Sequence, residues 1–147
     1  MRLRTKNLAD YAQDKAFRTP EAVAIYLENG EHIRFGSIFK EAMALATSLS
    51  NLGLKAGDVI SFQLPNWRET VALDIAAVWL GLVVNPVIPI YRDHELAFIL
   101  ADSRCRCLFI PGVYRGYDFP EMIERLSPEL PDLQHVITVR DDPQREG

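Results

Sequence analysis

The chain has 147 residues, of which 48% are hydrophobic and 24% charged, a balance typical of a soluble globular protein. This length is one domain's worth, and its net charge of −4 argues against a nucleic acid partner, because phosphate binding needs a basic surface. The first residues carry basic side chains with no apolar run behind them, so they do not form a secretory signal.

The first part of the chain predicts a helix followed by a β-hairpin. Asn7 suits the N-cap of a short helix that Thr19-Pro20 stops. Ala22 to Glu28 is a strand pattern, and Asn29-Gly30 predicts a two-residue hairpin turn. The return strand is expected over Glu31 to Phe35.

A second, amphipathic helix is predicted from apolar residues at steps of three and four. These residues are Ile38, Ala42, Leu45, Leu49 and Leu52. Gly53 fits the position just after the helix, with Leu54 placed to pack back on its last turn.

The stretch from Asp58 to Tyr91 predicts a strand, a buried helix and a second strand. Val59 to Leu64 is the first strand, and Asn66 has the position of an N-cap with Glu69 three residues later. From Val71 to Leu80 only Asp74 is polar, so the helix belongs inside a domain. Two strands joined by such a helix indicate a parallel sheet.

A membrane span competes for the same stretch, since Val71 to Ile90 has about the length of a bilayer crossing, roughly 20 residues. Asp74, Asn85 and two prolines would leave polar groups and broken backbone in hydrocarbon, which favours a protein core over a span.

Two further pairs of helix and strand follow. Asp93 is expected to cap a helix that closes at Asp102-Ser103, before a strand over Arg106 to Ile110. The second pair is a helix over Asp118 to Leu126, with Pro120 in its first turn, and a strand over His135 to Val139.

The pattern as a whole predicts an α/β fold. An N-terminal helix and β-hairpin precede an open, mostly parallel sheet with helices on both faces. Residues 1–140 form the domain, and residues 141–147 are a polar tail.

Ligands of open parallel sheets bind beyond the carboxyl ends of the strands, which here are the loops at Pro65-Asn66, Pro86 to Asp93 and Pro111 to Asp118. None contains a glycine-rich phosphate loop; Gly112 and Gly116 indicate a flexible loop.

Candidate ligand residues at and near these loops each have a plain structural alternative. Arg92 and Arg115 are the cations best placed for an anion, although both are also typical of solvated surface arginines. Asn66 can touch a ligand or serve only as a cap, and Asp74 is either a perturbed acid or a hydrogen-bonded one.

The sequence contains no residue pattern that predicts a metal site or a catalytic group. Cys105 and Cys107 would share one face of a strand, a poor geometry for a disulfide, and two reduced cysteines fit a cytosolic protein. The three histidines are scattered singly, so no metal site is predicted. No Ser or Cys with a His and an acid can be assembled, and no catalytic residue is assigned.

Several stretches together resemble the amino-terminal part of the adenylate-forming acid–CoA ligases, from Asn7 to about Arg140. Gly57-Asp58-Val59 through Leu64-Pro65-Asn66 is similar to an early strand and Pro-Asn loop of that superfamily. Its second conserved block resembles the stretch from Gly81 to Pro86 with Pro89, Glu95-Leu96 and Asp102-Ser103. Phe62 to Trp67, Arg92 and Tyr114 to Asp118 resemble most the cyclohexanecarboxylate and short- to medium-chain fatty acid ligases.

The chain also departs from the family pattern. Arg34-Phe35-Gly36-Ser37 stands where the family usually has a capping box, so the second helix should start less firmly. The family's phosphate loop, its Thr-Gly-Asp segment and its catalytic lysine do not occur in these 147 residues.

The resemblance implies a two-step ligase in which a carboxylic acid, ATP and Mg²⁺ give an acyl-adenylate, and CoA then takes the acyl group. It places Arg92 on the side that faces the CoA nucleotide. We therefore expect an N-terminal fragment of a cytoplasmic acid–CoA ligase, inactive alone, with no cofactor of its own and the missing C-terminal segment as a possible partner. The alternative is a non-catalytic α/β module that binds a partner chain or a small ligand.

Overall fold

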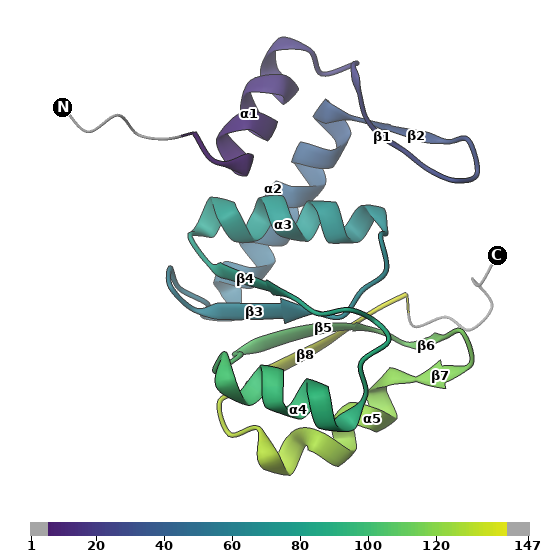
Figure 1. The fold of residues 1–147 in the computed structure, drawn as a ribbon. Helices are drawn as coiled ribbons and strands as arrows, with labels where there is room; N and C mark the ends of the chain where they lie inside the picture. Colours follow the sequence, from purple (N-terminus) through teal and green to yellow (C-terminus); the bar gives the residue numbers. More distant parts are fainter. Residues whose placement is uncertain (1–5, 141–147) are drawn as a thin grey trace. The chain divides into compact units, whose positions relative to one another are not determined.

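The computed structural model describes residues 6–140, so the predicted tail at 141–147 lies outside the described residues. The described chain forms two compact units. The helical unit comprises residues 6–57 and 67–82, and the sheet unit comprises residues 58–66 and 83–140. Figure 1 shows the elements of both.

The helical unit contains three helices and one hairpin. These are α1 (Leu8–Arg18), β1 (Val23–Tyr26), β2 (His32–Arg34), α2 (Phe35–Asn51) and α3 (Arg68–Leu80). The predicted cap of α1 is confirmed: the Asp10 amide donates to Asn7 Oδ1 at 2.8 Å, and Asp10 Oδ2 accepts from the Asn7 amide. α2 begins without a side-chain cap, as its missing capping box predicts.

The hairpin of β1 and β2 has a three-residue loop, so the predicted two-residue turn is wrong. Tyr26 pairs with His32, and the Leu27 amide donates to the Glu31 carbonyl at 2.8 Å, which leaves residues 28–30 as the loop. Gly30 adopts φ +84°, the left-handed conformation that closes such a loop. The Asn29 side chain is used in the same turn, where it accepts from the Glu31 amide.

The apolar stripe of α2 is buried at Ile38, Ala42, Ala46 and Leu49, whereas Leu52 lies at the surface. Gly53 follows the helix with φ +82°, and the Leu54 amide donates to the Leu49 carbonyl. This is the helix end that the sequence predicts.

The start of α3 differs from the prediction. Trp67, with an extended backbone, is the N-cap residue and makes no side-chain capping bond, so α3 begins at Arg68. Asn66 lies one residue too early for its side chain to reach the first amides of the helix, and it is exposed. The start of α3 is instead tied to α2 by the ion pair between Arg68 and Glu41.

The sheet unit holds a four-stranded parallel sheet with strand order β4-β3-β5-β8. Its elements are β3 (Val59–Phe62), β4 (Val83–Pro86), α4 (Asp93–Asp102), β5 (Cys107–Pro111), β6 (Val113–Tyr114), β7 (Tyr117–Asp118), α5 (Phe119–Leu126), a 3₁₀ turn (Ser127–Glu129) and β8 (His135–Val139). The α/β class and the parallel sheet are thereby confirmed.

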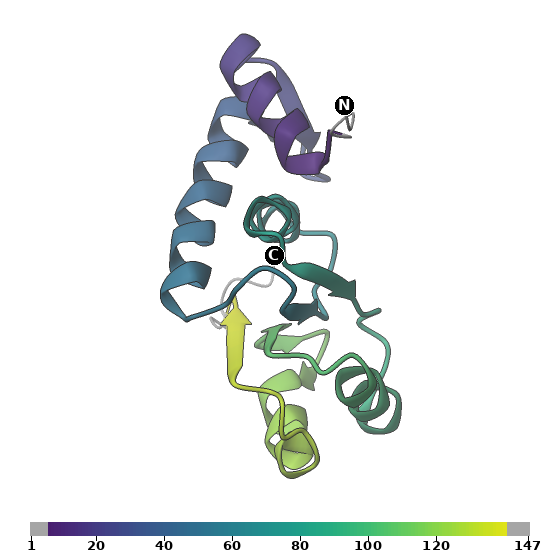
Figure 2. The same cartoon turned by 90° about the vertical axis from the view of Figure 1, so that its left-hand side faces the viewer.

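α4 and α5 pack on one face of this sheet (Figure 2). Leu108 and Ile110 of β5 meet Leu96 and Leu100 of α4 in this cluster, and α5 contributes four more buried side chains, Phe119, Met122, Ile123 and Leu126. Every residue of β5 is buried, as expected for the interior strand of a parallel sheet.

Two helix starts in the sheet unit test the predicted caps. Asp118 caps α5, because its Oδ1 accepts from the Glu121 amide at 2.9 Å. Asp93 does not cap α4: the N-cap residue is Arg92, and Glu95 reaches back to the Arg92 amide at 3.4 Å. Asp93 occupies the first helical position instead, where a carboxylate also suits the helix dipole.

No helix described between Lys6 and Arg140 is long and apolar enough to cross a membrane.

Candidate functional site

The carboxyl ends of β3, β4 and β5 lie along one edge of the parallel sheet, because these strands run in the same direction. The segments that leave this edge are residues 63–66, the loop at 87–92 and the hairpin of β6 and β7. We call them together the carboxyl edge. Parallel sheets bind ligands in this position.

A fully buried amide holds two of these segments together. Gln63 follows β3 and has no exposed surface. Its Nε2 donates to the Ile88 carbonyl at 3.1 Å and to the Tyr91 carbonyl at 2.9 Å. Within the described residues, its Oε1 is buried without a hydrogen-bond donor. Gln63 therefore fixes the 87–92 loop through one end of its side chain only.

Arg92, the last residue of the 87–92 loop, also holds this loop in place. Its Nη1 donates to the carbonyls of Pro89 and Tyr91 at 2.7 and 2.8 Å. The guanidinium carbon lies 4.0 Å from the ring centroid of Tyr117 and 5.6 Å from that of Phe119. The predicted ligand residue thus has a structural role, in which it joins the loop to the hairpin after β5.

The segment predicted as a flexible loop at Gly112 to Gly116 contains a tight hairpin. Tyr114 pairs with Tyr117, and both residues of the turn have positive φ, +51° at Arg115 and +72° at Gly116. Two turn residues with positive φ are typical of a type I′ turn, which suits the twist of two antiparallel strands. Arg115 is exposed at the tip, with its guanidinium 5.4 Å from the Tyr114 ring centroid.

A charge pair connects the start of α4 with the end of α5. Arg125 donates to both carboxylate oxygens of Asp93, from Nε at 3.0 Å and from Nη2 at 3.1 Å, and Nη2 also lies 3.4 Å from the Tyr117 hydroxyl. The Arg125 hydrogen bond lowers the pKa of Asp93 below its usual value. Tyr117 therefore contacts one arginine through its ring and another through its hydroxyl.

The described residues contain no metal-binding cluster and no activated cysteine. Between Lys6 and Arg140 there is no group of three or more His, Cys, Asp or Glu that could hold a metal ion. Cys105 and Cys107 are free and buried, and burial raises the pKa of both thiols, that of Cys107 to about 12. A thiol held in the neutral form is a poor nucleophile.

The remaining sequence candidates take no part in the contacts that Gln63, Arg92 and Tyr117 make at the carboxyl edge. Asn66 is exposed and caps nothing. Asp74 lies half-buried on α3, and burial raises its pKa. The sequence interpretation of a perturbed acid is therefore supported for the pKa of Asp74, but we assign Asp74 no role in a site. The edge residue that the sequence analysis missed is Gln63. Its signal was a single polar residue inside the apolar run from Val59 to Leu64.

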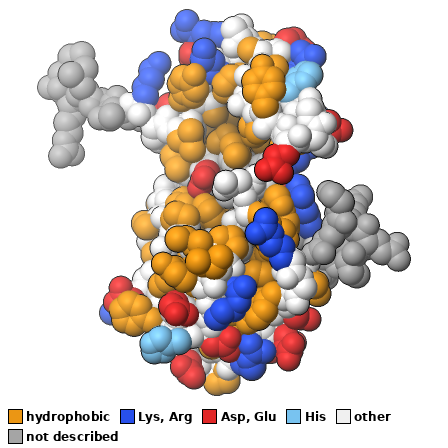
Figure 3. All heavy atoms as spheres, turned by 45° about the vertical axis from the view of Figure 1, so that its right-hand side comes forward, with side chains coloured by type: hydrophobic (Ala, Val, Ile, Leu, Met, Phe, Trp, Pro, Cys, Tyr) orange, Lys and Arg blue, Asp and Glu red, His pale blue; other side chains and the backbone are white. Residues whose placement is uncertain are grey.

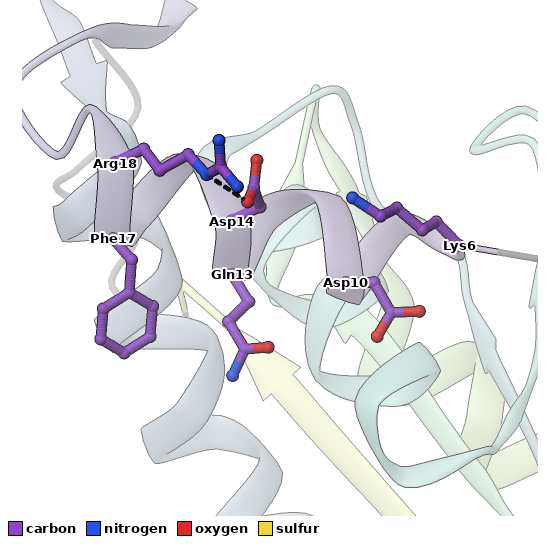
Figure 4. A pocket seen from close by; sticks show the side chains of 6 residues that line it. All are labelled: Lys6, Asp10, Gln13, Asp14, Phe17 and Arg18. Carbon is purple, nitrogen blue, oxygen red and sulfur yellow. Dashed lines mark ion pairs between the residues drawn. The ribbon is translucent and has the colours of Figure 1, made fainter. Parts of the chain in front are cut away.

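Two hollows are found on the helical unit, one on α1 and one between α1 and α3. The larger, of about 590 Å³, is lined by six residues, which are Lys6, Asp10, Gln13, Asp14, Phe17 and Arg18. Figure 4 shows these side chains projecting from α1 and, for Lys6, from the segment before it. Arg18 and Asp14 are directed at one another in an ion pair of 2.7 Å. Because one helix supplies nearly all of its lining, we assign it no ligand.

The comparisons with known proteins place the chain in a family. The family model described as "AMP-binding enzyme" matches residues 12–147. The medium-chain fatty-acid–CoA ligase of Escherichia coli (strain K12) is 30% identical over 133 residues, which are 90% of this chain and 24% of that protein. The vibriobactin-specific 2,3-dihydroxybenzoate-AMP ligase of Vibrio cholerae is 30% identical over 132 residues, again 90% and 24%.

Solved structures show the same fold. An anthranilate CoA ligase in complex with anthranoyl-AMP superposes with a TM-score of 0.81 at 21% identity, covering 93% of this chain and 26% of that one. A fatty acyl CoA synthetase of Mycobacterium tuberculosis gives 0.79 at 21% identity, covering 90% and 26%. The chain spans about a quarter of the length of the curated relatives it matches. With the family model matching from residue 12 to residue 147, the chain belongs to the AMP-binding enzyme family.

Proposed function

We propose that the chain supplies the amino-terminal part of an ATP-dependent acid–CoA ligase. The observation that carries this proposal is the family match over residues 12–147, together with relatives that are themselves named CoA ligases. In the reaction, a carboxylate oxygen attacks the α-phosphorus of ATP, and pyrophosphate leaves. The CoA sulfur then attacks the acyl carbon, the thiol proton is lost, and AMP leaves with the former carboxylate oxygen.

These 147 residues are proposed to be inactive alone. They contain no glycine-rich phosphate loop, and the described residues hold no cluster of acidic or histidine side chains suited to Mg²⁺. The residues present therefore do not fit ATP·Mg²⁺, and no step of this reaction is assigned to them. The groups that bind the nucleotide would come from the further polypeptide that ligases of the relatives' length contain.

Arg92 is the residue that we propose for CoA, as a contact to one of its phosphates. Within residues 6–140 both hydrogen bonds of its side chain start from Nη1, so Nη2 and Nε remain as donors. The contact with the Tyr117 ring, at 4.0 Å, holds the guanidinium in place, and a guanidinium suits phosphate geometry. In a complete enzyme, Arg92→Lys keeps the charge but loses the planar donor pair. This substitution should raise the KM for CoA and leave the KM for ATP nearly unchanged.

Arg115→Lys is the matched control, because Arg115 lies on the hairpin joined to the same edge but is exposed at its tip. A KM for CoA that stays unchanged in Arg92→Lys would remove Arg92 from the site. A KM for CoA that rises equally in both variants would indicate a general effect of replacing an arginine in this region, and would not support a contact of Arg92 with CoA.

For substrate and compartment, we propose a small carboxylic acid and the cytoplasm. The named relatives act on fatty and aromatic acids, which supports the class but selects no member. Two free thiols within the described residues support a reducing compartment.

The test is to extend the chain along its natural reading frame and measure ATP–pyrophosphate exchange over a panel of fatty and aromatic acids. The proposal expects a phosphate loop in the added sequence and exchange that depends on the acid. A natural polypeptide that ends without such a loop, or an extended protein without exchange on any acid, would contradict it.

A further inference from the structure

Tyr117 is held in place at both ends of its side chain. Its ring packs edge-to-face on the Phe119 ring, with 5.2 Å between the centroids and 84° between the planes, and Phe119 is only 1% exposed. Its hydroxyl lies 3.4 Å from Nη2 of Arg125, which is itself fixed by both carboxylate oxygens of Asp93. The Tyr117 ring therefore has a fixed orientation, because a core aromatic ring and a charge pair leave it little freedom to turn.

Arg92 lies over this ring. Its guanidinium carbon is 4.0 Å from the ring centroid, and its Nη1 donates to two carbonyls of its own loop. A free arginine side chain has many rotamers, so a ligand that must first order the side chain binds less tightly than a ligand that meets it already ordered. The contact with Tyr117 supplies this order within the chain itself.

Arg115 and Tyr114 form the matched pair on the same hairpin. Tyr114 pairs with Tyr117 across the two strands, and both tyrosines pack, partly buried, against the same core cluster. The Arg115 guanidinium, however, lies 5.4 Å from the Tyr114 ring centroid, and Arg115 is exposed. Figure 3 shows basic and hydrophobic side chains next to one another on the face that it draws, so nearness of the two kinds does not by itself mark a site. Arg92 differs by its closer contact with a ring of fixed orientation.

We propose that Tyr117 is a positioning residue for Arg92: its ring holds the guanidinium ready for a phosphate of CoA, and Tyr117 itself does not contact CoA. This inference rests on the proposed contact of Arg92 with CoA. Because the ring makes the contact with Arg92, Tyr117→Phe should preserve the effect and Tyr117→Leu should remove it.

The first experiment is arginine side-chain NMR of the 147-residue chain, which needs no CoA. Protons over an aromatic ring resonate upfield, so Hε of Arg92 should lie upfield of Hε of Arg115, with Arg92→Lys identifying the signal. The shift should persist in Tyr117→Phe and in the matched control Tyr114→Leu, and should be largely lost in Tyr117→Leu. A shift that survives in Tyr117→Leu, or that both leucine variants lose equally, would overturn the proposal. An unshifted Arg92 in the parent chain would overturn it even if Tyr117→Leu fails to fold.

The second experiment measures the kinetics of the complete enzyme. Tyr117→Leu should raise the KM for CoA about three- to tenfold, in keeping with a cation–π contact, and leave the KM for ATP and kcat nearly unchanged. Tyr117→Phe should keep the parent KM. In the double variant with Arg92→Lys the two effects should not multiply, because Tyr117 acts only through Arg92. Effects that multiply in full would overturn the proposal.

The outcomes separate this inference from the proposed function. If Arg92→Lys raises the KM for CoA and Tyr117→Leu does not, Arg92 stays in the site and the positioning role of Tyr117 is overturned. If neither variant raises it, the proposed contact of Arg92 with CoA fails. An NMR shift that depends on the Tyr117 ring would then show that the role of Tyr117 is structural only, which also overturns the inference.

Discussion

The orientation of the Gln63 amide can be tested by two substitutions that remove its donor in different ways. The carbonyls of Ile88 and Tyr91 each keep a second donor when Gln63 is replaced: the Tyr91 amide for Ile88, at 3.2 Å, and Arg92 Nη1 for Tyr91, at 2.8 Å. Gln63→Leu therefore leaves neither carbonyl without a partner. It also removes the buried Oε1, which has no donor within the described residues.

The expected magnitudes follow from these contacts. Two neutral hydrogen bonds contribute about 2 kcal/mol, and removing an unsatisfied buried oxygen returns about 1–3 kcal/mol, so Gln63→Leu should cost no more than about 1 kcal/mol. Gln63→Glu loses the same bonds and points a carboxylate oxygen at two carbonyls in a buried site. An unpaired buried charge should raise its cost to about 3–5 kcal/mol at neutral pH.

Burial without a cationic partner should raise the folded-state pKa of the introduced carboxyl above its unfolded value, about 4.3. Its destabilising effect is therefore largest above the folded pKa and disappears as the pH falls below the unfolded value. The extra cost of Gln63→Glu over Gln63→Leu should shrink from pH 7 to pH 4.

Urea denaturation followed by far-UV circular dichroism measures these costs. With a slope of about 2 kcal/mol per molar urea, 3 kcal/mol moves the midpoint by about 1.5 M. Gln134→Glu, a matched change at an exposed glutamine beside Arg106, should stay within about 0.5 kcal/mol of the parent chain. Equal stability of Gln63→Glu and Gln63→Leu at pH 7 would refute the assigned orientation.

Three further predictions concern capping, pH and thiol reactivity. Asp118→Ala should lower the free energy of unfolding by about 1 kcal/mol because Asp118 caps α5, whereas Asn66→Ala should change it by less than about 0.5 kcal/mol; coincident urea midpoints for these two variants would contradict this. Folding lowers the pKa of Asp93, so its pairing with Arg125 stabilises the folded chain above the unfolded pKa, and this stabilisation is lost as the pH falls through the folded pKa. Asp93→Asn should therefore remove this acid-dependent component from urea midpoints measured at decreasing pH. A pH profile that is the same in Asp93→Asn and in the parent chain would count against the pair. Because Cys105 and Cys107 are buried and their pKa values are raised, a thiol reagent at pH 8 should label them slowly in the folded chain and rapidly in urea; fast labelling of the folded chain would show that the thiols are accessible.

The elements with strong local signals were predictable from the sequence. The strand at His135–Val139 has the predicted bounds, because a β-branched run lies between polar and proline-rich segments. The end of α2 was predictable for a similar reason, since Gly53 adopts the left-handed conformation that glycine favours there.

Errors arose where two adjacent residues competed for one role. Asn66 is the better capping residue by type, but the backbone at Trp67 is extended and the helix starts after it. At α4 the N-cap residue is Arg92 and not Asp93, because Glu95 lies three residues after Arg92 and accepts from its amide. Residue preference at a cap is worth only about 1 kcal/mol, so tertiary contacts can move a helix start by one position.

The position of the carboxyl edge was predictable from the sequence, but the hydrogen bonds between its segments were not. Parallel strands bring the loops after β3, β4 and β5 together, and the sequence placed Arg92 in one of them. That Gln63 would bridge to the Ile88 and Tyr91 carbonyls depends on contacts 25 and 28 residues apart, which no local pattern reports. The hairpin at Arg115-Gly116 was missed because a non-glycine residue has positive φ at its first turn position.

We propose that this chain is the first part of an acid–CoA ligase and that it does not carry the groups that bind the nucleotide. The decisive experiment is ATP–pyrophosphate exchange with Mg²⁺ present, measured over a panel of fatty and aromatic acids on protein shown by mass to be these 147 residues. We predict no exchange above background with any acid. Acid-dependent exchange by this protein alone would contradict the claim, because adenylate formation would then need nothing beyond these residues.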